Sequence, residues 1–365
     1  MNEDKAARYH RLKRRVSVAS LAWTAALLTG LLATGWTVAL RNAVETIAPA
    51  APALGYVLLL SLINETVALP LAFYGGFLLE RRYNLSNEGF GAWLRDQAKS
   101  FGVALVFGGG AAVLIYRLMR WLPAWWWLAA AASFALLMVV LTNLAPVVLL
   151  PLFYSLKPLS RETLRARLLA LAERAGARVL GAYEWGLAEK TKKANAALTG
   201  IGRTRRILVS DTMLAEYSED EIEVVLAHEL AHHVHGDIWK GILFESALVV
   251  AGFYLAARVL SALVGVVGLR GVSDVAGMPA LLLAAGAVSV LMLPAAHAMS
   301  RAFERNADRF ALNLTQNPSA FISAMRRLGA QNLAEEDPSR IVQWLFYTHP
   351  PIGERIEAAR AFSNR

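Results

Sequence analysis

The chain has 365 residues, of which 56% are hydrophobic and 18% charged, and its mean hydropathy is +0.42. This composition is more apolar than that of soluble globular proteins and predicts an integral membrane protein. The formal net charge is +9, but the basic residues gather beside apolar segments, where they meet anionic lipid, so we expect membrane lipid and no nucleic acid as a partner. Because the chain has no cysteine, disulfides, thiolate metal ligands and a cysteine nucleophile are excluded.

Six apolar segments are long enough, or nearly so, to cross a bilayer as helices, which takes about 20 residues. In chain order they lie at about 16–40, 54–79, 101–118, 125–150, 242–267 and 279–297. The first segment is too long for a removable signal and is expected to stay as an anchor. Inside the second, Asn64 and Glu65 are costly in lipid, so they are expected to face a wet cavity or to bond to another helix.

The orientation of these spans follows from the basic residues, which are enriched on the cytoplasmic side of membrane proteins. Lys and Arg cluster before the first span and again between the second and third. With six crossings, both termini and the segment of about 155–240 are then also cytoplasmic. The sequence therefore predicts a multi-pass protein whose polar segment lies inside the cell.

The polar segment between the fourth and fifth spans predicts a small α+β unit. Residues 161–176 have the period of an amphipathic helix, and residues 179–185, 194–198 and 206–210 read as short strands separated by glycines. In zinc proteases a strand edge beside the metal can pair with an extended substrate backbone. Asn195 and Ala196 are our candidates for that edge, although an ordinary strand flanked by turns would look the same.

A metal-binding pattern follows at His228-Glu229-Leu230-Ala231-His232, on a predicted helix that begins after Ser218. Residues four apart lie one turn apart on the same helix face, so both imidazoles can reach a single Zn²⁺. Glu229 faces the same cleft and is placed to take a proton from water and later hand it to a leaving amine. The pattern is typical of metalloproteases, with one zinc ion per chain as the expected cofactor.

A catalytic zinc site needs a third protein ligand and keeps one position open. The candidate is Glu304, in a charged helical stretch after the last apolar segment, and Asp308 lies one turn further on the same face. Asp308 is placed to orient a ligand histidine and fix its tautomer. Read without the first motif, the same stretch would be a solvated helix with internal ion pairs.

Further polar residues follow the motif or lie near the C-terminus. His233 and His235 lie off the face of the two ligand histidines, so they are expected to be polar surface groups or to support the ligands and not to bind the metal. Asp237 is a second candidate for orienting a ligand. Near the C-terminus, His349 stands before two prolines that begin a helix and is a candidate donor to the tetrahedral oxyanion, while Arg355 is a candidate to fix that oxyanion or a substrate carboxylate. A plain N-terminal helix cap is the alternative.

Several separate segments resemble one known family, the type I CaaX prenyl proteases, which are zinc-dependent membrane endopeptidases. Besides the metal motif, they together cover most of the chain: Glu80-Arg81-Arg82-Tyr83-Asn84-Leu85-Ser86 with Asp96-Gln97, the stretch 146–158, Ala194-Asn195-Ala196, Asp211-Thr212, the stretch 304–308 and His349-Pro350. The shorter chain and six spans, against seven in eukaryotic members, resemble the prokaryotic branch.

The resemblance implies zinc held by His228, His232 and Glu304, with Glu229 as base and Asn195 and His349 at the substrate. It also implies a mainly α membrane protein whose helices enclose an intramembrane chamber beside a small cytoplasmic α+β unit. The implied substrate is a peptide or protein, prenylated at a C-terminal CaaX sequence, from which a tripeptide is removed. On this basis we divide the chain into 1–156, 157–240, 241–298 and 299–365: four spans, the α+β metalloprotease segment, two spans, and a helical segment carrying the third ligand.

Two other functions compete with this one. A membrane-protein quality-control protease of HtpX type would share the site chemistry, but such chains have fewer spans before the metal motif, whereas four precede it here. A transporter or a non-catalytic metal-binding scaffold would use Asn64 and Glu65 to line a path. That reading leaves the α+β segment and the intact Glu229 without a role.

Overall fold

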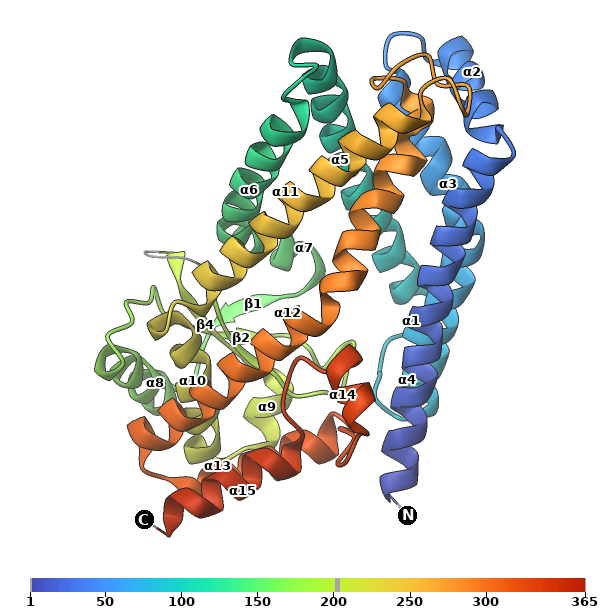
Figure 1. Ribbon diagram of the computed structural model, residues 1–365. Helices are drawn as coiled ribbons and strands as arrows, with labels where there is room; N and C mark the ends of the chain where they lie inside the picture. Colours follow the sequence, from blue (N-terminus) through green and yellow to red (C-terminus); the bar gives the residue numbers. More distant parts are fainter. Residues whose placement is uncertain (1, 201–203, 365) are drawn as a thin grey trace.

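Long helices form one end of the molecule and a compact α/β unit forms the other (Figure 1). The computed structural model describes residues 2–200 and 204–364. Within them, five helices are long and apolar enough to cross a membrane: Lys5–Ala33, Pro52–Arg82, Phe90–Trp121, Asp237–Leu263 and Val275–Thr315. A sixth crossing results if the bent pair Trp126–Thr142 and Val147–Phe153 is a single span. The expected mainly α, multi-pass architecture is confirmed.

The N-terminal part consists of seven helices along the described chain. They are α1 (Asn2–Ala33), α2 (Trp36–Ile47), α3 (Pro52–Ala72), α4 (Leu79–Arg82), α5 (Phe90–Trp121), α6 (Trp126–Leu144) and α7 (Leu150–Phe153). Two of the expected spans were wrong in detail. The segment 16–40 is broken, because α1 ends at Ala33 and Gly35 turns the chain with a φ of 75°. The segment 125–150 bends by 58°, where π-helical hydrogen bonding over Ala145–Leu149 interrupts the regular helix.

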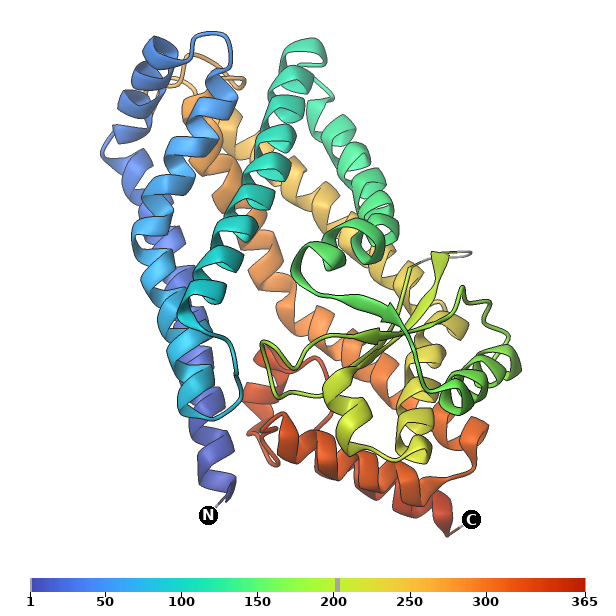
Figure 2. The ribbon, with the colours of Figure 1, turned by 180° about the vertical axis from the view of Figure 1, so that it is seen from behind.

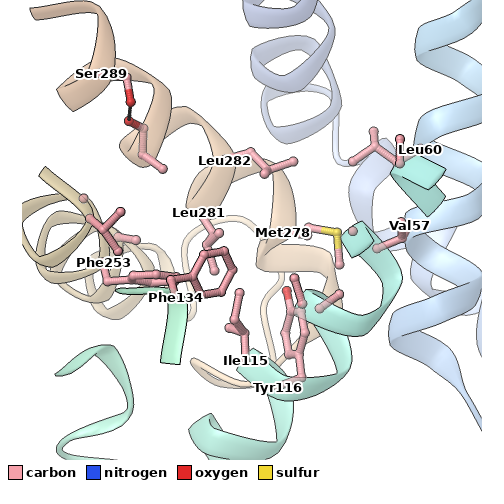
Figure 3. A pocket seen from close by; sticks show the side chains of 18 of the residues that line it. Val57, Leu60, Ile115, Tyr116, Phe134, Phe253, Met278, Leu281, Leu282 and Ser289 are labelled. Atoms are coloured by element: carbon pink, nitrogen blue, oxygen red, sulfur yellow. Dashed lines mark hydrogen bonds between the residues drawn. The ribbon is translucent and has the colours of Figure 1, made fainter. Parts of the chain in front are cut away.

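The membrane part is completed by α11 (Asp237–Leu263) and α12 (Met278–Thr315), which pack against each other. Helix α11 also packs against α6 and α12 against α1, and one apolar core includes buried side chains of α3 and α5. A cavity of about 440 Å³ lies among these helices. Its lining includes Leu60, Ile115, Phe134 and Leu281 (Figure 3). Elsewhere in α3, the Asn64 Oδ1 atom accepts a hydrogen bond from Thr24 Oγ1 of α1 at 3.3 Å. Of the two expectations for Asn64, a wet cavity or a bond to another helix, the structure therefore shows the bond to another helix.

The α/β unit holds a four-stranded sheet in the order β1-β2-β4-β3. Its strands are β1 (Leu156–Pro158), β2 (Ala182–Trp185), β3 (Ala196–Thr199) and β4 (Arg206–Ser210). β2 and β4 are parallel, and the other two pairs are antiparallel. The three expected strands are present, and β1 is additional: it has three residues beside the end of a membrane helix, too few for a period to be read. Since β3 ends the order, it is an edge strand as expected.

Helices complete the unit. They are α8 (Glu162–Arg174), α9 (Asp211–Glu216), α10 (Glu219–Val234), α13 (Pro318–Gln331), α14 (Arg340–Phe346) and α15 (Ile352–Ser363). Of these, α8, α9 and α10 contact the sheet, and the C-terminal helices pack on α10, on α12 and on one another. One buried core joins side chains from the expected segments 157–240 and 299–365, including Leu168, Leu226, Phe321 and Ala359. The two segments thus form one body, with α12 running into it from the membrane helices (Figures 1 and 2). The segment boundaries that we assigned stay a prediction.

Candidate metal centre

Helix α10 carries the two histidines of the motif on a rigid, buried support. Its start is held by a capping box, in which Ser218 Oγ accepts from the Glu221 N–H at 3.3 Å and Glu221 Oε2 accepts from the Ser218 N–H at 2.8 Å. Leu226, Ala227, Leu230 and Ala231 on the same helix are fully buried against the sheet and the C-terminal helices. Packing on these residues fixes the rotation of α10, so the histidine face has one orientation.

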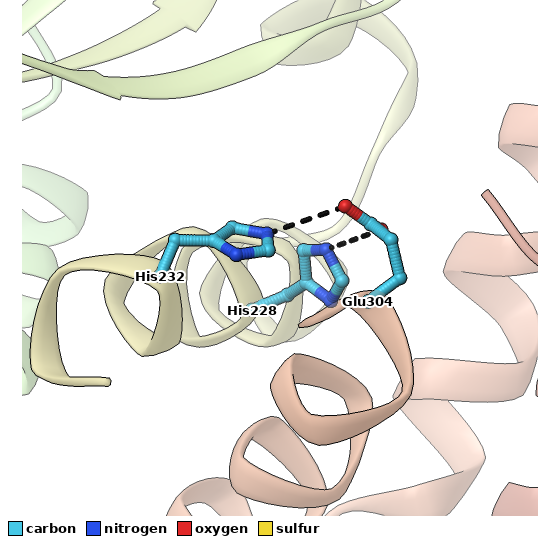
Figure 4. Close-up of side chains that lie close together, drawn as sticks. All are labelled: His228, His232 and Glu304. Carbon is cyan, nitrogen blue, oxygen red and sulfur yellow. Dashed lines mark ion pairs between the residues drawn. The ribbon is translucent and has the colours of Figure 1, made fainter. Parts of the chain in front are cut away.

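The third candidate ligand, Glu304, comes from α12, which crosses α10 (Figure 4). Glu304 Oε2 lies 3.1 Å from His228 Nε2, and Glu304 Oε1 lies 3.4 Å from His232 Nε2. The three ligand atoms that these side chains offer all lie within 4.8 Å of one another. The structure thus brings together the three residues that the sequence predicted as ligands, although they come from helices about 70 positions apart in the chain.

The donor set fits a divalent metal ion. Glu304 Oε2 is buried and has no hydrogen-bond partner among the described residues, since its approach to His228 has the distance of an ion pair but not the geometry of a hydrogen bond. An unpaired buried carboxylate oxygen is costly unless a cation meets it. Two imidazoles and a carboxylate are a ligand set typical of catalytic zinc.

Carboxylates behind the two histidines orient both rings. Asp308 Oδ1 lies 2.8 Å from His228 Nδ1, and Asp237 Oδ2 lies 3.1 Å from His232 Nδ1. A proton on each Nδ1 leaves each Nε2 free as a metal ligand, which is the usual arrangement of ligand histidines. Asp308 therefore lies where the sequence predicted, and Asp237, the second candidate, serves the second ring in the same way.

Burial and neighbouring carboxylates shift the pKa values of the two histidines and of Glu229. Burial alone would lower the pKa of His228, but the carboxylates of Asp308 and Glu304 outweigh it and raise the pKa to about 9. The pKa of His232 is also raised, because Glu304 and Asp237 outweigh its burial. Burial raises the pKa of Glu229. Without a metal ion His228 therefore holds its proton above neutral pH, and a metal that binds there must displace it.

Arg355 reaches the centre from α15, but from behind. Its Nε and Nη2 atoms donate to the two oxygens of Asp308 at 2.9 and 2.6 Å, and its side chain is only 9% exposed. This bidentate pair holds the carboxylate that orients His228. The sequence predicted Arg355 at the substrate, whereas the structure commits two of its donors to Asp308.

A cleft of about 350 Å³ opens in front of the metal centre. Asn195, Ala196, Glu229 and His349 line it, together with His228 and Arg355. The His349 side chain is 59% exposed, with Nε2 at 3.4 Å from Glu304 Oε1. All the predicted substrate-side residues therefore meet at one cleft.

Sequence reasoning missed the far wall of this cleft. His10 of α1, Asn332 after α13, Glu335 and Tyr347 line it. Glu335 Oε2 accepts from Arg14 at 2.7 Å and from the Tyr347 hydroxyl at 2.5 Å, so the first membrane helix is tied to the C-terminal segment. No local pattern marks these residues, because they meet only through packing between distant segments.

Comparison with known proteins agrees with this description. A family model described as peptidase family M48 matches residues 158–363, and a model described as CAAX prenyl protease N-terminal, five membrane helices, matches residues 2–155. The Bacillus subtilis metalloprotease YhfN is 31% identical over 320 residues, which are 85% of this chain and 74% of that protein. CAAX prenyl protease 1 of Saccharomyces cerevisiae is 28% identical over 214 residues, 57% of this chain and about half, 47%, of the yeast protein.

The fold is also found in a solved structure. The crystal structure of S. mikatae Ste24p aligns with a TM-score of 0.86 at 23% identity, covering 98% of this chain and 88% of that one. Fold and site together define an integral membrane metallopeptidase. The chain belongs to peptidase family M48, and the match of residues 2–155 confirms the resemblance to the CaaX prenyl proteases.

Proposed function

We propose that this chain is a zinc endopeptidase in which His228, His232 and Glu304 hold the ion and Glu229 moves the proton. The observation that carries the proposal is the convergence of the three ligand atoms within 4.8 Å, beside a buried carboxylate oxygen without a partner. The carboxylates Asp308 and Asp237 support it, because they leave both Nε2 atoms free for a metal.

Zinc bound by such ligands polarises a carbonyl and lowers the pKa of water, which is the chemistry that the ion would supply here. Glu229 follows His228 on the same helix and lines the cleft, so it can accept a proton from water and return it to the leaving amine. Burial raises the pKa of Glu229, which brings this carboxyl closer to the range in which it can both accept and return a proton.

The substrate side of the cleft is formed by the strand edge and the C-terminal segment. We assign the backbone of Asn195 and Ala196 to substrate binding and His349 to donation toward the oxyanion, supported by their place in the cleft with Glu229. Arg355 we assign to holding Asp308, in preference to direct contact with a substrate carboxylate, because Nε and Nη2 are already used.

For the substrate class we propose the C-terminal tail of a protein that carries a prenyl group at a CaaX sequence. Several relatives are named CAAX prenyl protease, which motivates the choice. The apolar cavity of about 440 Å³ supports it, since ligand pockets typically have about 300–1,000 Å³. Among the lining residues, Phe134 and Phe253 offer aromatic faces to a hydrocarbon chain (Figure 3).

We further propose that both termini and the cleft lie on the cytoplasmic side. In Figure 1 both ends of the chain lie at the end that holds the α/β unit. Lys5, Arg8 and Arg11 are in the first turns of α1 at that same end. Basic residues beside a membrane span are retained in the cytoplasm, which supports this orientation.

The test is cleavage of a farnesylated CaaX peptide and its unprenylated twin by detergent-purified protein, with bound zinc measured. Glu229→Gln should keep the zinc and lose about 10²–10⁴-fold in rate, which is the usual contribution of general acid–base catalysis. Glu223→Gln is the matched control, because it makes the same charge change on α10 at a residue that pairs with Arg167.

Each outcome decides a separate part of the proposal. Preference for the farnesylated peptide supports the substrate class, and equal cleavage of both peptides argues for a broader membrane protease. A Glu229→Gln protein as active as wild type would remove Glu229 from the mechanism. Purified protein that binds no zinc would overturn the catalytic assignment.

A further inference from the structure

Most of the outward backbone N–H and C=O groups on the free edge of β3 are already hydrogen-bonded to other parts of the protein. In an antiparallel pair, alternate residues bond to the partner strand and the others direct their backbone groups outward. Ser210 N–H donates to the Asn195 carbonyl at 2.9 Å, so Asn195 and Ala197 bond toward β4. Ala194, Ala196 and Leu198 therefore direct their N–H and C=O groups away from the sheet.

At the first of these outward positions, an amide side chain takes the place of a neighbouring strand. Asn332 Oδ1 accepts from the Ala194 N–H at 3.1 Å, and Asn332 Nδ2 donates to the Ala194 carbonyl at 3.2 Å. Two residues earlier, at Lys192, both backbone groups are also bonded. The Lys192 carbonyl accepts from Gln331 Nε2 at 2.9 Å, and the Lys192 N–H donates to the Leu85 carbonyl. The edge is closed up to Ala194.

At the other end, an imidazole from the metal helix closes the edge. His233 Nε2 lies 3.1 Å from the carbonyl oxygen of Leu198 and donates to it. His233 follows the proposed ligand His232, so its bond also ties the strand edge to the metal helix α10. Between the two closures, Ala196 is the outward residue of the described stretch 192–198 whose N–H and C=O are both without a partner. Ala196 lines the cleft together with Glu229.

We infer that the edge strand binds the substrate backbone at one residue, Ala196, and that Asn332 and His233 set this register. This inference rests on the proposed function, and it adds the residues that determine which peptide bond of the substrate lies at the metal centre. A peptide paired at Ala196 makes two main-chain hydrogen bonds and meets a filled edge on both sides. A substrate strand cannot slide along β3, because sliding by two residues would require the bonds that Asn332 or His233 already makes. Asn332 and His233 are positioning residues, and the suited substrate is a short flexible tail.

The experiment maps the cleavage positions in a farnesylated CaaX peptide by mass spectrometry for wild type, Asn332→Ala and His233→Ala. Wild type should cut chiefly at one bond. Each variant should add a cut displaced by two residues, because outward groups recur at every second strand position. Its share should rise roughly two- to tenfold, which corresponds to one ordinary hydrogen bond. His235→Ala is the matched control, since that ring packs edge to face on Phe310 of α12 and not on β3.

Zinc content and thermal unfolding are measured for every variant, because a merely structural role would lower them without moving the cut. His233→Gln can still donate to the Leu198 carbonyl and should restore the single cut, even where His233→Ala is poorly folded. An unchanged cleavage pattern in folded Asn332→Ala and His233→Ala, or a displaced cut in His233→Gln, overturns the inference and leaves the proposed function standing. Absence of cleavage by wild type would instead strike the proposed function.

Discussion

Replacing Asp308 with alanine should weaken zinc binding and destabilise the protein through two separable effects. The Asp308 carboxylate lies 2.8 Å from His228 Nδ1, and loss of such an orienting partner typically lowers metal affinity about 10- to 100-fold. It also pairs with Arg355, whose side chain is 9% exposed. Removing one partner of a buried ion pair costs about 3–5 kcal/mol, because the other charge stays buried alone.

The two effects can be separated by the double variant Asp308→Ala/Arg355→Met, which removes the stranded charge. It should regain most of the thermal stability but none of the zinc affinity, as measured by thermal unfolding and by competition with a chelator. Asp237→Ala is the matched control at His232: this pair is at 3.1 Å on a ring that is 21% exposed, so a smaller loss is expected. Zinc held by Asp308→Ala as tightly as by wild type would refute the reasoning.

Two further predictions concern protonation and the far end of the helices. Because the pKa of His228 is about 9 in the metal-free protein, its proton must leave when zinc binds. Chelator competition should therefore give a zinc affinity that rises at least about tenfold per pH unit below that value and less steeply above it. A flat profile below that value would contradict the assignment of His228 as a ligand. Arg41→Ala should lower stability by about 3–5 kcal/mol in thermal unfolding, because it strands Asp274 in a pair whose side chains are 6% and 2% exposed. Its zinc content should equal that of wild type, and loss of zinc would show that the two ends of the molecule are coupled.

Short-range periodicity was enough to predict the helices and the metal motif. His228, Glu229 and His232 share a face because the helical repeat is local, and the capping box at Ser218 and Glu221 begins that helix. The amphipathic pattern of 161–176 likewise became α8, Glu162–Arg174. Length and apolarity identified the membrane helices, but Gly35 and the π-helical turn after α6 changed their limits, since a hydropathy pattern does not register local backbone geometry.

The sequence by itself thus determined the class of the protein and the residue types of its site, because those depend on composition and on spacing within one helix. Only the tertiary structure shows that Glu304 lies beside the two histidines, that Arg355 holds Asp308, and that Asn332 and His233 close the edge of β3. Each of these contacts joins segments tens to hundreds of residues apart. Their positions follow from how α10, α12, α13 and α15 pack around one core, and packing of that kind leaves no periodic mark in the chain.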